Sequence, residues 1–237
     1  DRSSAASDVY KRQILIFISS CSSLSNLKFW ESEEVEDDEP RKLQNYNEVF
    51  KIENSWKISF DGENTLGNFK PSFSGKNIYF ADTEGNVKSI DISTGIVNWS
   101  IKLDKLASGI SSGFGVLIVS NTTGEVICLD QEKGSILWSR DVKGEVLSNA
   151  AIDAKIIVIK TSSGELLGLS KESGTTKWSY RSKLPTLTIR GSSSPIIEEN
   201  KVYATFDSGR LGVFELDSGF LLWDSAISNV FLLYTAD

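Results

Sequence analysis

The chain has 237 residues, of which 40% are hydrophobic and 24% charged, so it is long enough to bury a sizeable core. Its net charge is −7, and an acidic chain without a basic stripe argues against nucleic acid as a partner. Histidine is absent, which removes the usual general base and the commonest metal ligand, and two cysteines are too few for a disulfide framework. We therefore expect no catalytic residues, no metal and no cofactor.

The two ends of the chain do not read as parts of a fold. Residues 1–13 (DRSSAASDVYKRQ) resemble the translated end of an adaptor used in library preparation. The tail within residues 230–237 resembles the same adaptor translated from the opposite strand. Both segments are excluded from the fold prediction.

A short apolar run ends at the first cysteine. Residues 14–20 (ILIFISS) are too few to cross a bilayer as a helix. Together with Cys21 they resemble the end of a bacterial lipoprotein signal peptide, since residues 18–21 (ISSC) fit the lipobox. That resemblance implies that residues 14–20 are a signal-peptide remnant, that Cys21 carries the lipid, and that Ser22 directs the protein to the outer membrane. The alternative is a buried strand with an ordinary core cysteine.

Polar sequence separates this cysteine from the first candidate strand. Residues 21–46 are poor in apolar side chains and contain an acidic run at 31–39, so we expect a solvated tether. The segment 49–60 (VFKIENSWKISF) is expected to be an isolated outer strand carrying Trp56. In a closed ring, such a strand would complete the last sheet.

A unit of two glycines and a tryptophan occurs four times between residues 85 and 223. In each copy the second glycine follows the first by ten residues, and the tryptophan follows four residues later. The copies begin at Gly85, Gly124, Gly164 and Gly209, at intervals of 39, 40 and 45 residues. A repeat period of about 40 residues is typical of solenoids and propellers.

Each repeat contains short apolar runs separated by turn residues. In the third copy these runs occupy residues 155–161, 165–169 and 175–180, and one more apolar segment, 146–152, precedes them. Glycines at the turns supply the positive φ that tight hairpins need. Four strands per repeat predict an all-β partial propeller of four four-stranded antiparallel blades within residues 47–229.

The tryptophan of each copy belongs to the last predicted strand of its blade. Burying such a ring removes roughly 150–250 Å² from water, so one ring per blade in register would wedge neighbouring blades together. An aromatic cage for a ligand is the alternative, but the regular placement favours packing. The four predicted structural residues are Trp99, Trp138, Trp178 and Trp223.

The second cysteine lies inside a predicted strand. Cys128 is flanked by apolar residues in VICLD and has no CxxC partner. We expect a buried, unreactive thiol rather than a redox or catalytic group.

The longest interval between copies separates the third from the fourth. Its extra residues lie at 183–197 (KLPTLTIRGSSSPII), and loops on a rigid β scaffold often carry function. Leu187 and Ile189 alternate beside Arg190, and an apolar pair next to an arginine makes a compact anchor for a partner. The alternative is that Leu187 and Ile189 face the core from an innermost strand while Arg190 caps a loop.

The repeat and its flanks resemble a known family. Residues 89–99 (SIDISTGIVNW) resemble the tryptophan-docking repeat of pyrroloquinoline-quinone-type propellers. With the lipobox, residues 49–56 (VFKIENSW) and residues 184–194 (LPTLTIRGSSS), the chain resembles the BamB family, the propeller lipoproteins of the outer-membrane β-barrel assembly machinery. The resemblance covers about residues 14–229. It implies an eight-bladed ring, of which this chain supplies four blades and an outer strand.

The resemblance also implies a partner and a function. In the family, a loop of pattern Leu-x-Leu-Arg-Gly contacts the POTRA domains of BamA, the barrel subunit. Leu187, Ile189 and Arg190 match that pattern here, with isoleucine in place of the second leucine and Gly191 following. The implied protein is a non-catalytic scaffold, lipid-anchored at the periplasmic face of the outer membrane, that assists outer-membrane protein folding and insertion. The family's acidic contact loop would lie past residue 237.

Two other functions stay open at this point. One is a propeller that binds another cell-envelope protein or a polysaccharide. The other is part of a quinoprotein dehydrogenase, because those enzymes share the repeat. They resemble this chain only there, and they use a catalytic aspartate, a calcium site and often a vicinal cysteine pair, whereas no Cys-Cys pair occurs in this sequence.

Overall fold

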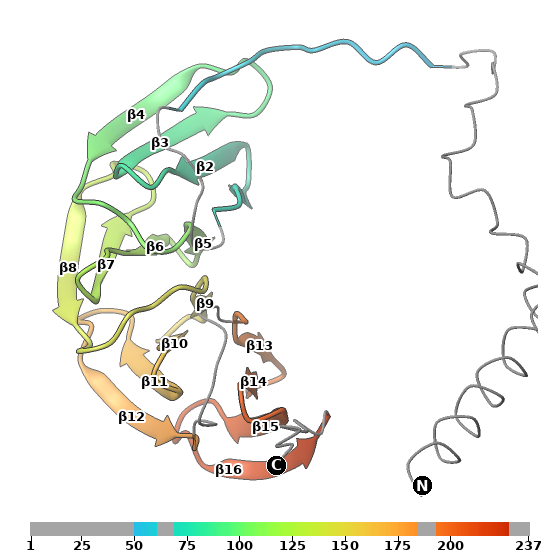
Figure 1. The fold of residues 1–237 in the computed structure, drawn as a ribbon. Coiled ribbons are helices and arrows are strands. Elements are labelled where there is room, and N and C mark those ends of the chain that lie inside the picture. The colour runs from blue at the N-terminus through green and yellow to red at the C-terminus, as the bar shows by residue number, and fades with distance from the viewer. Residues whose placement is uncertain (1–49, 61–68, 184–192, 228–237) are drawn as a thin grey trace, which may run out of the picture. The chain divides into compact units, whose positions relative to one another are not determined.

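A computed structural model describes residues 50–60, 69–183 and 193–227. The chain divides into two compact units, Asp1–Ile52 and Glu53–Asp237, and every described strand lies in the second. These strands form four antiparallel sheets of four strands, and in each sheet the strands are ordered as they are in the chain (Figure 1). The predicted all-β fold of four-stranded antiparallel blades is confirmed.

The strand bounds repeat from sheet to sheet. The first sheet consists of β1 (Ser72–Ser74), β2 (Asn77–Ala81), β3 (Asn86–Asp91) and β4 (Val97–Lys102). The second consists of β5 (Ser111–Gly113), β6 (Val116–Ser120), β7 (Glu125–Asp130) and β8 (Ile136–Asp141). The third consists of β9 (Ala151–Ile152), β10 (Ile156–Lys160), β11 (Glu165–Ser170) and β12 (Thr176–Arg181). The fourth consists of β13 (Ile196–Glu198), β14 (Lys201–Phe206), β15 (Arg210–Glu215) and β16 (Leu221–Ala226).

The two glycines of the repeat lie in the two outer hairpin turns of each sheet. In the third sheet, Gly164 follows β10 with φ of 76° and Gly174 follows β11 with φ of 68°. A side chain would strain the backbone at both positions, which explains why glycine recurs there. The tryptophan then stands in the last strand, and Trp178 lies opposite Gly168 with a register shift directly after it. The same shift occurs in the other three sheets.

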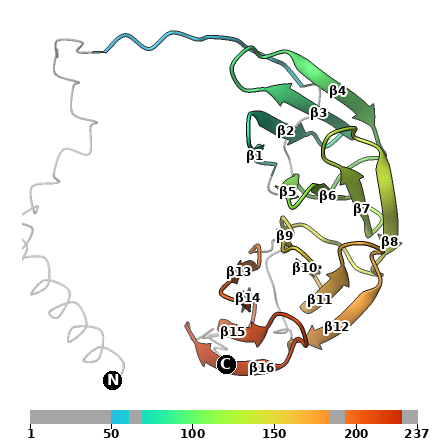
Figure 2. The same ribbon diagram turned by 180° about the vertical axis from the view of Figure 1, so that it is seen from behind.

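Consecutive sheets pack face to face along the chain. Three clusters of buried residues fill the spaces between the first and second, second and third, and third and fourth sheets. The strands β6 and β10 are buried along their whole length because their sheets are covered on both faces, and their sequences are accordingly continuous apolar runs. The innermost strands β1, β5, β9 and β13 lie on one side of this stack, and β4, β8, β12 and β16 on the other (Figures 1 and 2).

Two details differ from the sequence prediction. The innermost strand of the third sheet spans only Ala151–Ile152, although the apolar pattern extends over residues 146–152. Val146 and Leu147 are buried in the connection between sheets, and apolar content alone cannot distinguish such a connection from a strand. Residues 50–60 belong to none of the described strands, because a strand requires a hydrogen-bonded neighbour and these residues enter no ladder.

Candidate functional site

The tryptophan in the outer strand of one sheet reaches across to the next sheet. In three sheets the indole Nε1–H donates to the backbone carbonyl that directly follows the third strand of the neighbouring sheet. The donor–acceptor pairs are Trp99 with Gln131 at 3.3 Å, Trp138 with Lys171 at 2.8 Å, and Trp178 with Leu216 at 2.8 Å. Each ring thereby satisfies its one polar group on backbone while its apolar surface packs between sheets.

The second glycine of each repeat lies directly against one of these rings. A Cβ built on Gly134 would stand 2.6 Å from the ring of Trp99, and one on Gly174 would stand 2.5 Å from the ring of Trp138. No side chain fits at such a distance, so glycine is needed here for space as well as for its positive φ. Sequence reasoning assigned only the turn role to this glycine. The fixed spacing of glycine and tryptophan was the available signal for the contact.

Trp56 makes the corresponding contact with the first sheet. Its Nε1 donates to Ile92 O at 2.8 Å, and a Cβ on Gly95 would lie 2.5 Å from its ring. Ile92 follows β3 just as Gln131 follows β7, so Trp56 occupies on the first sheet the place that Trp99 occupies on the second. The similarity of WKISF at residues 56–60 to WSIKL at 99–103 indicates this relationship in the sequence.

The fourth tryptophan of the repeat lies in a different environment. Trp223 in β16 is 49% exposed, whereas Trp178 is 8% exposed. Phe220, Leu222 and Ile227 next to it are also exposed, so an apolar surface covers this outer part of the fourth sheet. Within residues 50–60, 69–183 and 193–227, the indole of Trp223 has no hydrogen-bond acceptor.

The other residues singled out in the sequence lie outside the described part of the chain. They are the lipidation candidate Cys21 and the partner-binding candidates Leu187, Ile189 and Arg190. The structure does describe both flanks of the second group, where the chain leaves β12 and where it returns at Ser193.

A buried lysine binds the chain at Ser193, shortly before β13. Lys160, the last residue of β10, is 4% exposed, and its Nζ donates to Ser193 Oγ at 2.8 Å and to Thr205 O at 2.6 Å. Burial lowers the pKa of Lys160, an effect that the charge of Asp207 partly opposes. The neighbouring Ser194 accepts a hydrogen bond from the backbone of Asn149 at 3.1 Å. Sequence reasoning missed this lysine, whose signal is a lone cation ending the apolar run IIVIK.

Cys128 is buried in β7, opposite Trp138 in the ladder. Burial raises the pKa of its thiol to about 12, so almost no thiolate forms near neutral pH. The prediction of an inert core cysteine is confirmed.

Side-chain clusters that could hold a metal ion and helices that could span a membrane are absent from the described residues. There, no three residues of the types His, Cys, Asp and Glu come together in a way that could hold a metal ion. The same part of the chain contains no helix with the length and hydropathy needed to cross a membrane.

The repeat residues match a protein family. A family model described as outer membrane protein assembly factor BamB matches residues 83–231, which include the repeat tryptophans Trp99, Trp138, Trp178 and Trp223. The chain belongs to this family. The BamB of Nitrosomonas eutropha is 31% identical over an alignment of 225 residues, which covers 91% of this chain and 54% of that protein. The chain thus spans about half the length of the curated relatives it matches.

Solved structures support the fold. The crystal structure of BamB from Moraxella catarrhalis superposes with a TM-score of 0.60 at 22% identity, over 66% of this chain and 47% of that one. A quinohemoprotein alcohol dehydrogenase from Comamonas testosteroni superposes with a TM-score of 0.54 at 14% identity, over 68% of this chain and 35% of that one. At these identities both likenesses concern the fold alone, so the family assignment comes from the sequence comparisons.

Proposed function

We propose that this chain acts as a non-catalytic scaffold in outer-membrane protein assembly. The observation that carries the proposal is the family match across all four repeats, to relatives named outer membrane protein assembly factor BamB. The tryptophan contacts support a structural use of the repeat, because their indole N–H groups are satisfied by backbone and not directed at a ligand site. Cys21 provides the lipid anchor at the periplasmic face of the outer membrane in this proposal.

The proposed partner is BamA, bound through its POTRA domains by Leu187, Ile189 and Arg190. Three described hydrogen bonds hold the chain directly after this stretch, and they support the proposal. Lys160 and Thr205 bind Ser193, and Asn149 binds Ser194, so the chain is held in place directly after residue 192. A short stretch whose end is fixed loses less entropy on binding than a free one.

A pull-down with purified POTRA domains tests the partner assignment. Leu187→Ala, Ile189→Ala and Arg190→Ala are each expected to reduce the amount of chain captured. Arg181→Ala is the matched control, because this exposed arginine of β12 pairs with Glu165 at 3.0 Å within its own sheet. Undiminished capture of all three variants, or an equal loss in the control, would contradict the assignment.

The lipid anchor needs a separate test. Mass spectrometry of the chain expressed with a complete signal peptide is expected to find lipid on Cys21. An unmodified Cys21 would remove the anchor from the proposal and leave the partner assignment standing.

A further inference from the structure

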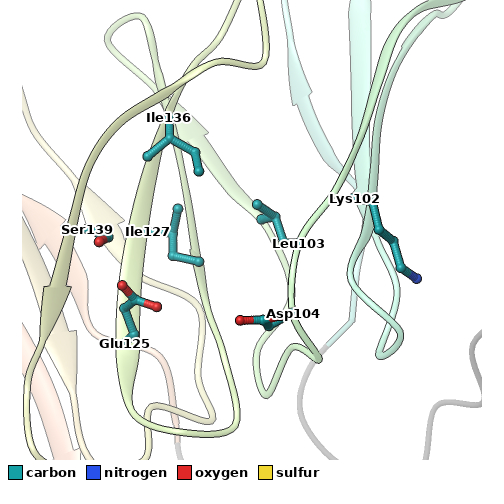
Figure 3. Close-up of a pocket in the computed structure, with 7 residues that line it drawn as sticks. All are labelled: Lys102, Leu103, Asp104, Glu125, Ile127, Ile136 and Ser139. Carbon is teal, nitrogen blue, oxygen red and sulfur yellow. The ribbon is translucent and has the colours of Figure 1, made fainter.

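A cleft of about 370 Å³ lies between the first and second sheets, where the chain leaves β4. Residues 102–104 form one wall, and β7 and β8 form the other through Glu125, Ile127, Ile136 and Ser139 (Figure 3). The volume is at the lower end of the roughly 300–1,000 Å³ typical of ligand pockets. The cleft therefore has room for a single side chain or a small group.

The lining combines apolar surface with two carboxylates. Leu103, Ile127 and Ile136 supply the apolar part, and the carboxylate of Asp104 points across the cleft toward Glu125 (Figure 3). Lys102 points away, and its Nζ donates to Asn86 Oδ1 in its own sheet at 3.2 Å. The remaining lysine of this connection, Lys105, pairs with Glu84 at 3.1 Å. The ammonium groups of Lys102 and Lys105 are thus bound to other residues and not to the two carboxylates of the cleft.

The other sheets show that this charge arrangement is a departure from the repeat. Glu165 stands in the third sheet where Glu125 stands in the second, and it lies opposite Arg181, with which it forms an ion pair at 3.0 Å. Glu125 instead lies opposite Asp141, another carboxylate. Two like charges directly opposite each other in a ladder are unfavourable. Asn121 Nδ2, at 2.9 Å, is the hydrogen-bond donor to the side chain of Glu125.

The segments that connect successive sheets also differ in charge. Asp104 follows β4 at the place where Lys143 follows β8, one repeat later. Between the second and third sheets, Lys143 and Glu165 therefore have opposite charges. At the equivalent positions between the first and second sheets, Asp104 and Glu125 are both carboxylates. The cleft has excess negative charge that the repeat elsewhere compensates, and a cation from outside would supply the missing compensation.

We propose that this cleft binds the side chain of an arginine presented by a protein partner. The guanidinium group is planar and has five N–H donors, so it can pair with Asp104 and Glu125 on opposite walls at once. Its methylene stem can pack on Leu103 and Ile127, as the stems of long basic side chains do on apolar surface. None of the residues that line this cleft belongs to the segment of Leu187, Ile189 and Arg190, and the inference does not depend on their role.

An NMR titration of the ¹⁵N-labelled 237-residue chain tests the inference. The probes are the peptide Ac-Ala-Arg-Ala-NH₂ and its counterpart with uncharged citrulline. The arginine peptide is expected to shift the amide signals of residues 102–104 and 125–127 saturably, with an affinity that falls as salt is added. Asp104→Asn together with Glu125→Gln is expected to weaken binding by about tenfold or more, since both charge-assisted contacts are lost.

Two further variants control the result. Glu165→Gln removes the same charge at the equivalent place in the third sheet and is expected to leave the affinity unchanged. Asp104→Lys puts into the cleft the residue type that Lys143 supplies one repeat later, so it is expected to fold and to abolish binding. Absence of saturable shifts at the cleft, an equal response to citrulline, or undiminished binding by the Asp104 and Glu125 variants would overturn the inference. Equal affinity for a lysine peptide would overturn the assignment to arginine.

Discussion

Trp178 and Trp223 occupy the same place in two successive repeats, and their surroundings differ. Trp178 is 8% exposed, its indole N–H binds Leu216 O at 2.8 Å, and its ring lies against Gly219 of the fourth sheet. Trp223 has the same strand position and ladder register but is 49% exposed. The sequence around each tryptophan therefore does not determine what the ring contributes. The contribution of the ring depends on the neighbouring sheet, which for Trp178 supplies the carbonyl of Leu216 and the close contact with Gly219.

Truncating the two rings is expected to give the largest difference between these positions. Trp178→Ala removes a buried ring and leaves a cavity between sheets, which should lower the free energy of unfolding by about 3–5 kcal/mol. Trp223→Ala should lower it by about 1 kcal/mol or less, because half of that ring is already exposed and surface changes cost little. Urea unfolding followed by circular dichroism measures both. Equal losses would show that the ring acts within its own sheet.

Changing the glycine on the other side of the contact tests the same interface. Gly174→Ala places a Cβ 2.5 Å from the ring of Trp138 at a φ of 68°, so it combines overpacking with backbone strain. A loss of about 2–4 kcal/mol in unfolding free energy is expected. Gly75→Ala is the matched control, since Gly75 also has a positive φ, 57°, but has open space around its Cβ position. Its expected loss is about 1–2 kcal/mol, from backbone strain alone.

A similar loss of unfolding free energy in Gly174→Ala and Gly75→Ala would mean that the ring of Trp138 is not held in close contact with Gly174. Relief of the Gly174→Ala defect by a second change, Trp138→Ala, would support the contact, because it removes the atoms that the new methyl group meets. Additive losses in that double variant would contradict it.

The sequence predicts the scaffold well because the same physical requirement recurs in every repeat. Turn glycines such as Gly164 and Gly174 adopt positive φ in every repeat. Short apolar strands alternate with these turns, and the spacing from glycine to tryptophan is the same in all four copies. The close approach of Gly174 to Trp138 was not predicted, because a turn glycine and a packing glycine look alike in a single sequence. The innermost strand was predicted at 146–152 and is found at Ala151–Ile152, because buried Val146 and Leu147 have the composition of a strand.

The candidate sites were predictable to a lesser degree. Leu187, Ile189 and Arg190 were selected by a resemblance and by an interval of 45 residues, and they remain predictions outside the described residues. Lys160 was missed, since a lone cation at the end of IIVIK is a weak signal that does not distinguish an exposed lysine from one that turns inward to Ser193. The cleft beside Asp104 was missed as well, because the two carboxylates that face each other are 21 positions apart, one in the connection after β4 and the other in β7 of the next sheet.

The buried lysine between the third and fourth sheets should give this interface a pH dependence that the open face at Trp223 lacks. Burial lowers the pKa of Lys160 in the folded chain below the unfolded value near 10.5. Between these two values the unfolded chain binds more protons, so stability should rise with pH until about 10.5. Lys160→Met is expected to remove this rise, as measured by urea unfolding at several pH values. A rise of the same size in the variant would assign it to another group.

The rate of thiol labelling of Cys128 compares the packed interface at Trp138 with the exposed face at Trp223. Cys128 is buried opposite Trp138, and its pKa of about 12 keeps it protonated, so Cys128 in the native chain should react with a thiol reagent only through opening of the sheets. Trp138→Ala is expected to accelerate labelling of Cys128. Trp223→Ala should leave the rate unchanged, and acceleration by both would indicate that the four sheets open as one unit.

We infer that the tryptophan contacts supply stability, and we propose that Leu187, Ile189 and Arg190 supply partner binding. The most direct test is the dissociation constant for POTRA domains, measured by calorimetry under conditions where each variant is folded. Arg190→Ala is expected to weaken binding by about tenfold or more without loss of unfolding free energy. Gly174→Ala is expected to lower the unfolding free energy and to leave the affinity of the folded chain unchanged. An affinity that follows stability in both variants would contradict the claim.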